Sequence, residues 1–182
     1  NHRGEFAAKA EEWGFTHIEA NSIVSPQMLD ELVDASMPIS SLHSPCPNRL
    51  SSTGAPASSL SLSSLDEAER KEAIRFAQDT IDIASRIGAR AVVLHLGEVP
   101  LDLSLQNRLY QLGRRGHTNN IEYNDIREKL TFQRASRASQ YVDAAEQSLR
   151  ELSRYSEQRG IVLGVETRFY FHEIPNIDEM ER

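Results

Sequence analysis

Three residues suited to metal binding each stand at the end of a short stretch rich in Ile, Val and Leu. They are His43 in Leu-His-Ser-Pro, His95 in Leu-His-Leu-Gly and Glu166 in Val-Glu-Thr-Arg. Two imidazoles and a carboxylate are a common zinc set, with manganese, iron or magnesium as alternatives, and an open position on such an ion would activate water or polarise a substrate oxygen. The set predicts a divalent metal site. Taken singly, each residue is equally typical of a hydrogen-bonded structural position.

The stretches that carry these residues alternate with amphipathic segments, which is typical of βα units and a parallel sheet. Four strand-like runs cover residues 15–20, 38–43, 90–96 and 161–166. Alternate side chains of a strand share a face, so His95 lies on the side of Val93. Glu166 likewise lies on the side of Gly164. If these faces point into a barrel, the three groups converge at its carboxyl-terminal mouth, where barrel enzymes keep their active sites.

Helices are predicted over residues 5–13, residues 66–88 and a long apolar stripe at 138–152 that Gly160 closes. The first helix should bury Phe6, Ala10 and Trp13 on one face. In the second, Ser64 and Asp66 both offer N-terminal caps. Residues 44–64 and 97–124 depart from the regular rhythm and are expected to be loops at the carboxyl ends of strands.

Further candidates surround the predicted metal site. Glu19 ends the first run, and its charge beside a barrel mouth would orient a ligand or substrate. Arg168 and His172 follow Glu166 closely among aromatic residues, and this group would hold a phosphate or stack on a sugar face. Each of these residues has an alternative structural role in loop packing.

Two other features are ambiguous. Cys46, three residues after His43, would either approach the metal or be an inert buried residue. The basic pair Arg114 and Arg115 would form either a solvated surface or an anion-binding lid.

The three motif segments resemble the strand ends of the xylose-isomerase-like barrels, which include sugar isomerases and epimerases and the repair enzyme endonuclease IV. The segments are Leu42-His43-Ser44-Pro45, Val93-Leu94-His95-Leu96-Gly97 and Leu163-Gly164-Val165-Glu166. The helix at 66–88 is also similar to that family. The resemblance implies an α/β fold, the (β/α)8 barrel, with the four runs as strands two to five. Residues 1–182 would then form a single partial barrel domain, truncated at both ends.

The resemblance also implies an activity and residue roles. In the epimerase branch, the matching glutamate binds a single divalent metal and acts as an acid or base, so Glu166 and His95 are the expected catalytic residues and His43, His95 and Glu166 the metal ligands. The branch's remaining ligands, an Asp, a His and a second Glu, would come from strands outside this chain. The first hypothesis is therefore a metal-dependent sugar or sugar-phosphate isomerase or epimerase.

Two alternatives remain open. In endonuclease IV the matching histidines and glutamate hold one zinc of a three-metal cluster, which would make this chain a phosphodiesterase acting at abasic DNA sites. The third hypothesis is a noncatalytic or incomplete barrel. Four strands would leave two sheet edges free to pair with another chain, so a homo-oligomer or other association is expected.

Composition bears on the partners. The 182 residues carry 20 Lys and Arg against 27 Asp and Glu, a net charge of −7 that favours a small carbohydrate over nucleic acid as substrate. No stretch approaches the ~20 apolar residues of a membrane helix, so no membrane partner is expected. With its single cysteine, the chain is typical of a cytoplasmic protein.

Overall fold

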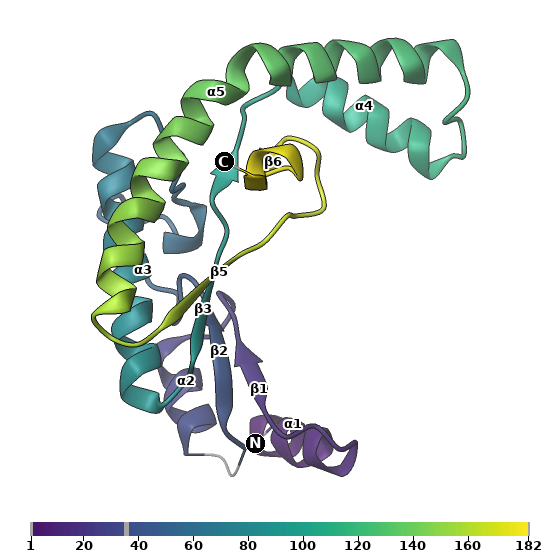
Figure 1. The fold of residues 1–182 in the computed structure, drawn as a ribbon. Coiled ribbons are helices and arrows are strands. Elements are labelled where there is room, and N and C mark those ends of the chain that lie inside the picture. Colours follow the sequence, from purple (N-terminus) through teal and green to yellow (C-terminus); the bar gives the residue numbers. More distant parts are fainter. Residues whose placement is uncertain (1, 35–36, 182) are drawn as a thin grey trace.

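Four parallel strands form the central sheet of the protein (Figure 1). The computed structural model describes residues 2–34 and 37–181. The strands are β1 (Ile18–Ala20), β2 (Ile39–His43), β3 (Ala91–Leu94) and β5 (Val162–Val165), in the spatial order β1-β2-β3-β5. All four strand-like runs are therefore confirmed as neighbouring parallel strands. β1 and β5 form the two edges of this sheet.

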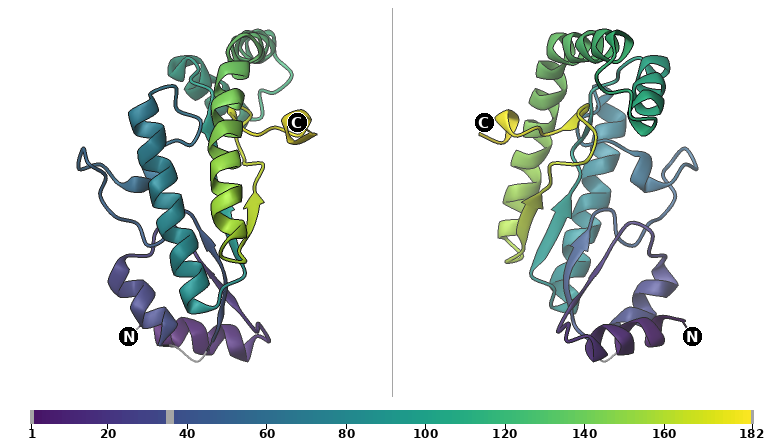
Figure 2. Two further views of the ribbon diagram at one scale, coloured as in Figure 1. Left: turned by 60° about the vertical axis from the view of Figure 1, so that its left-hand side comes forward. Right: turned by 90° about the vertical axis from the view of Figure 1, so that its right-hand side faces the viewer.

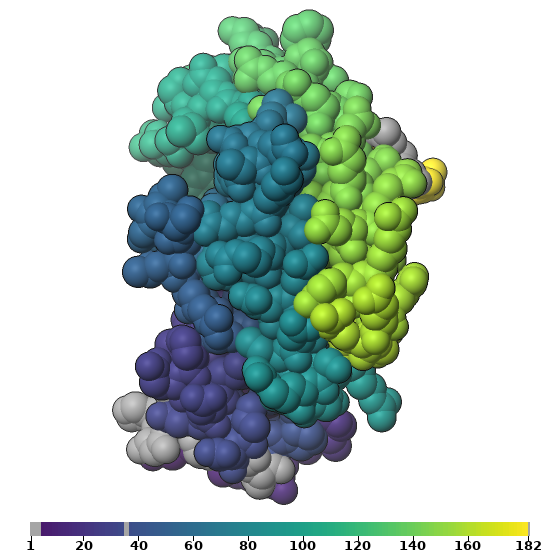
Figure 3. Space-filling model, turned by 90° about the vertical axis from the view of Figure 1, so that its left-hand side faces the viewer, coloured from purple at the N-terminus to yellow at the C-terminus, as the bar shows by residue number. Residues whose placement is uncertain are grey.

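Helices connect and cover these strands. They are α1 (His2–Glu12), α2 (Pro26–Val33), α3 (Glu67–Ile87), α4 (Leu103–Arg114) and α5 (Ile121–Glu157), with short 3-10 turns η1 (Ala57–Ser59) and η2 (Asp178–Glu181). α3 and the carboxyl-terminal half of α5 lie side by side on one face of the sheet (Figures 2 and 3). The first half of α5 pairs with α4 in a hairpin that extends past the carboxyl ends of the strands.

The two faces of the sheet differ in burial because successive strand residues point to opposite sides. Leu42, Val92 and Leu94 point towards the helices and are fully buried. Burial of such a side chain stabilises a fold by about 1.5–3 kcal/mol. On the other face, which would be the interior of a barrel, Val162 is 66% exposed. The core of the described chain therefore lies between the sheet and its helices.

The best helix of the sequence has well-defined ends. Asp66 is its N-cap, accepting hydrogen bonds from the backbone N–H of Ala68 at 2.8 Å and of Glu69. Gly88 ends the helix with φ +78, a left-handed conformation that favours glycine. Of the two caps that the sequence offered, Asp66 is the one used, and Ser64 instead donates to the Glu69 carboxylate.

Two expectations about local structure were wrong. Residues 97–124 are not an irregular loop, because Asp102 and Asn120 act as N-caps that start α4 and α5. In α1, the side chains that pack inward are Ala7 and Ala10, whereas Phe6 and Trp13 are exposed. The predicted apolar face of that helix is thus rotated, since the small alanines face the neighbouring elements.

A two-stranded antiparallel ladder was not predicted from the sequence. β4 (Gly97–Glu98) pairs with β6 (Glu173–Ile174), which joins the segment after β3 to the segment after β5. Gly97 has φ +127, and a Cβ there would lie 2.0 Å from the Ser61 Oγ. The close approach of the segment that contains Ser61 and Ser63 therefore requires glycine at this position. This ladder shapes the rim of the sheet where the candidate site lies.

Within residues 2–34 and 37–181, no helix combines the length and the apolar character that crossing a membrane requires.

Candidate metal site

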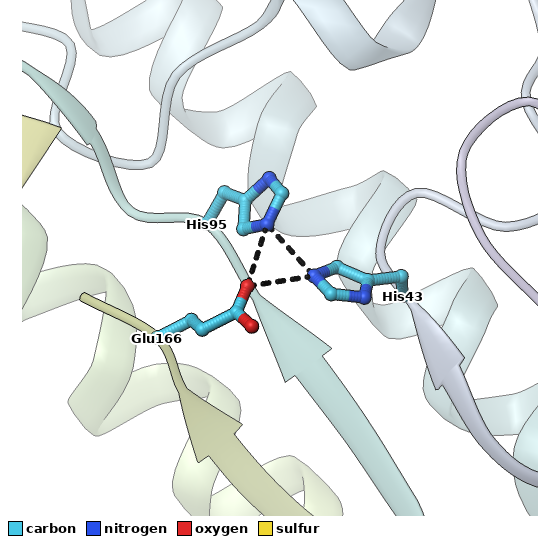
Figure 4. A group of neighbouring side chains, drawn as sticks. All are labelled: His43, His95 and Glu166. Carbon is cyan, nitrogen blue, oxygen red and sulfur yellow. Dashed lines mark hydrogen bonds and ion pairs between the residues drawn. The ribbon is translucent and has the colours of Figure 1, made fainter. Parts of the chain in front are cut away.

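The side chains of His43, His95 and Glu166 converge at the carboxyl ends of three adjacent strands (Figure 4). The Nε2 atoms of the two histidines lie 2.7 Å apart. The Glu166 Oε2 lies 3.2 Å from the Nε2 of His95 and 3.3 Å from that of His43. All three donor atoms fall within 4.8 Å of one another, so the sheet gathers the group that the strand ends predicted.

The strands explain this convergence. His43 is the last residue of β2, and His95 and Glu166 are the residues directly after β3 and β5. The register pairs Leu94 with Val165, so His95 and Glu166 lie level, and it pairs His43 with Val93, two positions before His95 on the same face of the sheet. Because their neighbours Leu42 and Leu94 are anchored under the helices, the site residues point to the opposite, open face.

The donor set fits a divalent cation. Ligands at ~2.0–2.2 Å around a tetrahedral ion lie ~3.3–3.6 Å apart, which matches the two distances to Glu166 closely. The two imidazole nitrogens are nearer than this, and a pair of facing lone pairs at 2.7 Å needs a proton or a cation between them. If the two imidazole rings moved slightly apart, an ion would fit between their Nε2 atoms and the Glu166 carboxylate.

A carboxylate behind His43 fixes the orientation of its ring. The Nδ1 of His43 lies 2.9 Å from the Glu19 Oε1, and Ser41 donates to the other carboxylate oxygen at 2.5 Å. With Nδ1–H donating to Glu19, the His43 Nε2 keeps its lone pair for a ligand. Burial alone would raise the pKa of Glu19, but the hydrogen bonds from Ser41 and His43 outweigh it and lower the pKa. Glu19 lies inside β1 and not at its end.

The electrostatic surroundings keep His95 neutral more readily than a free histidine. Burial lowers its pKa most, followed by the electrostatic effects of Arg168 and of the His43 ring, while Glu166 acts in the opposite direction. A neutral imidazole is the form that binds a metal. The charge of Arg168 thus reaches the candidate site, as expected for a residue two positions after Glu166.

Arg168 and His95 both line an open cavity of about 460 Å³. It lies between β4, α5 and the serine-rich end of the loop at residues 58–64. The Arg168 guanidinium is held by an ion pair with Glu173 at 2.7 Å. The cavity wall is rich in hydroxyl and charged groups, including Ser61, Ser64 and Glu98. The sequence did not single out Glu98 or Glu173, because only the pairing of β4 with β6 places them next to the strand ends.

His172 lies apart from the three converging side chains. Its Nε2 faces the Glu98 carboxylate at 3.4 Å, and its ring stacks on Tyr170 with centroids 5.4 Å apart. Among the described residues, no hydrogen bond, ion pair or ring contact joins it to His43, His95 or Glu166. Its role as a substrate residue remains a prediction, and it lines a different cavity from the one that His95 and Arg168 line.

The cysteine of the sequence lies outside the site. Cys46 is buried, and its backbone N–H donates to the Thr80 Oγ1 of α3 at 3.0 Å. Burial raises the pKa of its thiol to about 12. A protonated, buried thiol is a poor metal ligand, so the inert alternative describes this residue.

The two basic residues at the end of α4 make different contacts, one with an aromatic ring and one at the helix terminus. Arg114 places its guanidinium 5.8 Å from the centre of the Tyr110 ring, and Arg115 is the C-cap of the helix. Neither lies in the cavity beside His95.

The fold and the site define a class of protein. The xylose isomerase-like TIM barrel family matches residues 7–182, and the chain belongs to this family. No protein of curated function matches the sequence.

Several solved structures share the fold. A D-tagatose 3-epimerase-like protein is 20% identical with a TM-score of 0.55, and the alignment covers 91% of this chain and 49% of the other. The D-psicose 3-epimerase of Clostridium cellulolyticum H10, solved with D-tagatose, is 15% identical with a TM-score of 0.55, over 98% of this chain and 53% of the other. An L-ribulose 3-epimerase is 13% identical with a TM-score of 0.52, covering 91% and 43%. The chain therefore spans about half the length of these barrels.

Proposed function

We propose that this chain carries part of the active site of a divalent-metal-dependent sugar or sugar-phosphate isomerase or epimerase. The observation that carries the proposal is the convergence of His43, His95 and Glu166 on one point at the carboxyl ends of the strands. Active sites of (β/α)8 barrels lie at this end. The names of the structural neighbours, two 3-epimerases and a D-tagatose 3-epimerase-like protein, support the sugar class.

In this proposal His43 and His95 offer neutral Nε2 donors and Glu166 offers Oε2 as the anionic ligand. When bound, a divalent cation would polarise a carbonyl and hydroxyl pair of the substrate and stabilise negative charge that develops there. Glu19 holds His43 in the tautomer that leaves Nε2 free. Imidazole and carboxylate ligands of this kind would suit zinc, manganese, iron or magnesium.

Glu166 is the proposed acid or base. Its Oε1 makes no hydrogen bond or ion pair with any residue that the structure describes, whereas its Oε2 faces the two histidines. The side chain is 52% exposed on the open face of the sheet. A carboxylate oxygen that is free and accessible can take a proton from the carbon next to a substrate carbonyl and return it on the same face, whereas epimerisation also needs a second acid on the opposite face.

Arg168 and the hydroxyl-rich cavity are the proposed sugar-binding surface. The cavity of about 460 Å³ lies within the range of ~300–1,000 Å³ that small-molecule sites occupy. Its serines offer hydrogen-bond partners for sugar hydroxyls, and Arg168 supplies a planar cation suited to an oxyanion or phosphate. Binding to this wall would hold the reacting carbons beside His95 and Glu166.

The test is hydrogen exchange with solvent. The protein that carries residues 1–182, incubated with Mn²⁺ or Zn²⁺ and D-fructose or D-tagatose in D2O, should replace a carbon-bound hydrogen of the ketose with deuterium, as followed by NMR. Glu166→Gln should abolish the exchange, while Glu157→Gln, an exposed glutamate at the end of α5, should leave it unchanged. Exchange that persists in Glu166→Gln would remove the assigned base.

A parallel assay tests the alternative function, which is cleavage of DNA at abasic sites. A duplex with an abasic site is incubated with the same metal-loaded chain. Cleavage of the duplex without any exchange in the ketoses would replace the sugar proposal with the endonuclease IV-like one.

A further inference from the structure

A second cavity, of about 700 Å³, lies between α4 and the loop that follows β5. We call it the aromatic groove. Its wall combines Tyr110 and Arg114 of α4 with Phe169, Tyr170 and Phe171 of the loop. In Figure 1 the loop runs along the concave side of the molecule, beneath the α4–α5 hairpin. The loop that lines the groove therefore runs on the side of the sheet that the helices α3 and α5 leave uncovered.

The aromatic rings of this groove are exposed although they are held in place. Phe169 is 86% exposed and Tyr110 is 53% exposed. The loop is fixed through its backbone, since the Tyr170 N–H donates to the Glu173 carboxylate at 2.7 Å and the His172 carbonyl accepts from the Val99 N–H at 2.8 Å. Exposed rings on an ordered backbone are a preorganised stacking surface, because little further ordering accompanies binding.

The rings are also ordered relative to one another. Phe169 and Tyr170 meet edge to face with centroids 5.1 Å apart, and Tyr170 stacks on His172 at an angle of 20°. On the other wall, which α4 forms, the Arg114 guanidinium lies over the ring of Tyr110. The groove thus offers flat apolar faces with a cation at one side, a combination suited to a ring that has both an apolar face and polar edges.

The groove lies within reach of the metal site. Phe169 is three residues from Glu166, and a chain extends by at most ~3.6 Å per residue, so their Cα atoms lie within about 11 Å. The Glu98–His172 ion pair joins the two cavities, because Glu98 lines the one beside His95 and His172 lines the aromatic groove. A ligand anchored at Glu166 would need a second ring to reach the aromatic residues.

We propose that the aromatic groove is a subsite for a second ring attached to the reacting sugar, so that the substrate is a ketose substituted on an oxygen remote from its carbonyl. This inference rests on the proposed function, because the metal site must hold the reacting sugar. A reducing disaccharide of this type keeps the open-chain carbonyl that proton transfer requires. A substituent on the anomeric oxygen would block that carbonyl, which excludes simple glycosides from the class.

The experiment compares ligands that differ only in the second ring. Affinities of the Mn²⁺-loaded chain are measured calorimetrically for D-fructose, for the same ketose with a methyl group on O6, and for isomaltulose, which carries a second sugar ring on that oxygen. A benzyl ether at the same position distinguishes an aromatic from a saccharide ring. Isomaltulose or the benzyl ether should bind roughly 10-fold more tightly than the methyl ether, as expected for several ring contacts.

Variants locate the effect. Tyr110→Ala and Phe169→Ala should each reduce the preference for the ring-bearing ketose over D-fructose by roughly 2- to 10-fold. Phe132→Ala removes an aromatic ring that is 75% exposed on α5 outside the groove, and should leave the preference unchanged. Circular dichroism melts confirm that the variants are folded.

The outcomes separate the two proposals. Equal affinity for all ketoses together with deuterium exchange in D-fructose would overturn the subsite and leave the proposed function standing. A ring preference that both groove variants retain would also overturn the subsite. If no ketose binds or exchanges, the subsite and the proposed function both fail.

Discussion

The two faces of the sheet follow different rules. On the helix-covered face, Leu42, Val92 and Leu94 are fully buried under α3 and α5, and their role is to stabilise the fold. On the open face, the same strands present Val162 largely to solvent and end in His43, His95 and Glu166. Because successive side chains of a strand point to opposite faces, the same strands place core residues on one face and the candidate metal ligands on the other. Substitutions on the two faces should therefore have effects of different kinds.

The largest expected effect concerns the protection of Cys46 on the covered side. Burial raises the pKa of its thiol from an ordinary 9.0 to about 12, which reduces the reactive thiolate roughly 1,000-fold near neutral pH. Alkylation by iodoacetamide should therefore be slow in the native chain and fast in urea, and the single cysteine makes the measurement unambiguous. Because the thiol is protonated more tightly when folded, its contribution to stability should be lost as pH rises from 9.0 towards 12. Rapid alkylation in native buffer would contradict the burial.

Next in size is a matched pair of core substitutions. Leu94→Ala removes a fully buried side chain and should reduce the free energy of unfolding by about 2–5 kcal/mol. Val162→Ala on the open face should change it by no more than about 0.5 kcal/mol. Urea denaturation followed by circular dichroism measures both, and equal effects would mean that the open face is covered in solution, as the association expected from two free sheet edges would cause.

On the open face, Glu166→Gln should weaken metal binding by roughly 100-fold while leaving the unfolding transition in place. The substitution removes the anionic ligand and conserves the side-chain volume. Isothermal titration with Mn²⁺ or Zn²⁺ provides the affinity, and Glu157→Gln serves as the control. An unchanged dissociation constant in Glu166→Gln would exclude this carboxylate as a ligand.

The smallest effect is expected behind the site. Glu19→Gln keeps an acceptor for the His43 Nδ1–H but removes the negative charge, so metal affinity should fall by about 10-fold. Ser41→Ala removes only the hydroxyl that donates to Glu19 and should have a smaller effect. If Ser41→Ala weakens binding more than Glu19→Gln, the charge of Glu19 does not act through His43.

Much of the fold was predictable because it depends on local pattern. The four β-rich runs, the capped helix that begins after Asp66 and the parallel order of the strands follow from residue periodicity, caps and chain connectivity. The long helix α5 was recognised only in its second half. Its first half lacks a simple apolar stripe, since it packs partly on α4 and not on the sheet.

The sequence by itself determined which residues end the strands, because strand alternation and a shared register leave His43, His95 and Glu166 few other places to point. Only the tertiary structure decided what surrounds them. Glu19 reaches His43 across 24 positions, and Glu98 meets His172 through the β4–β6 ladder. Such contacts join segments that are distant along the chain, and their geometry depends on packing that no local periodicity encodes.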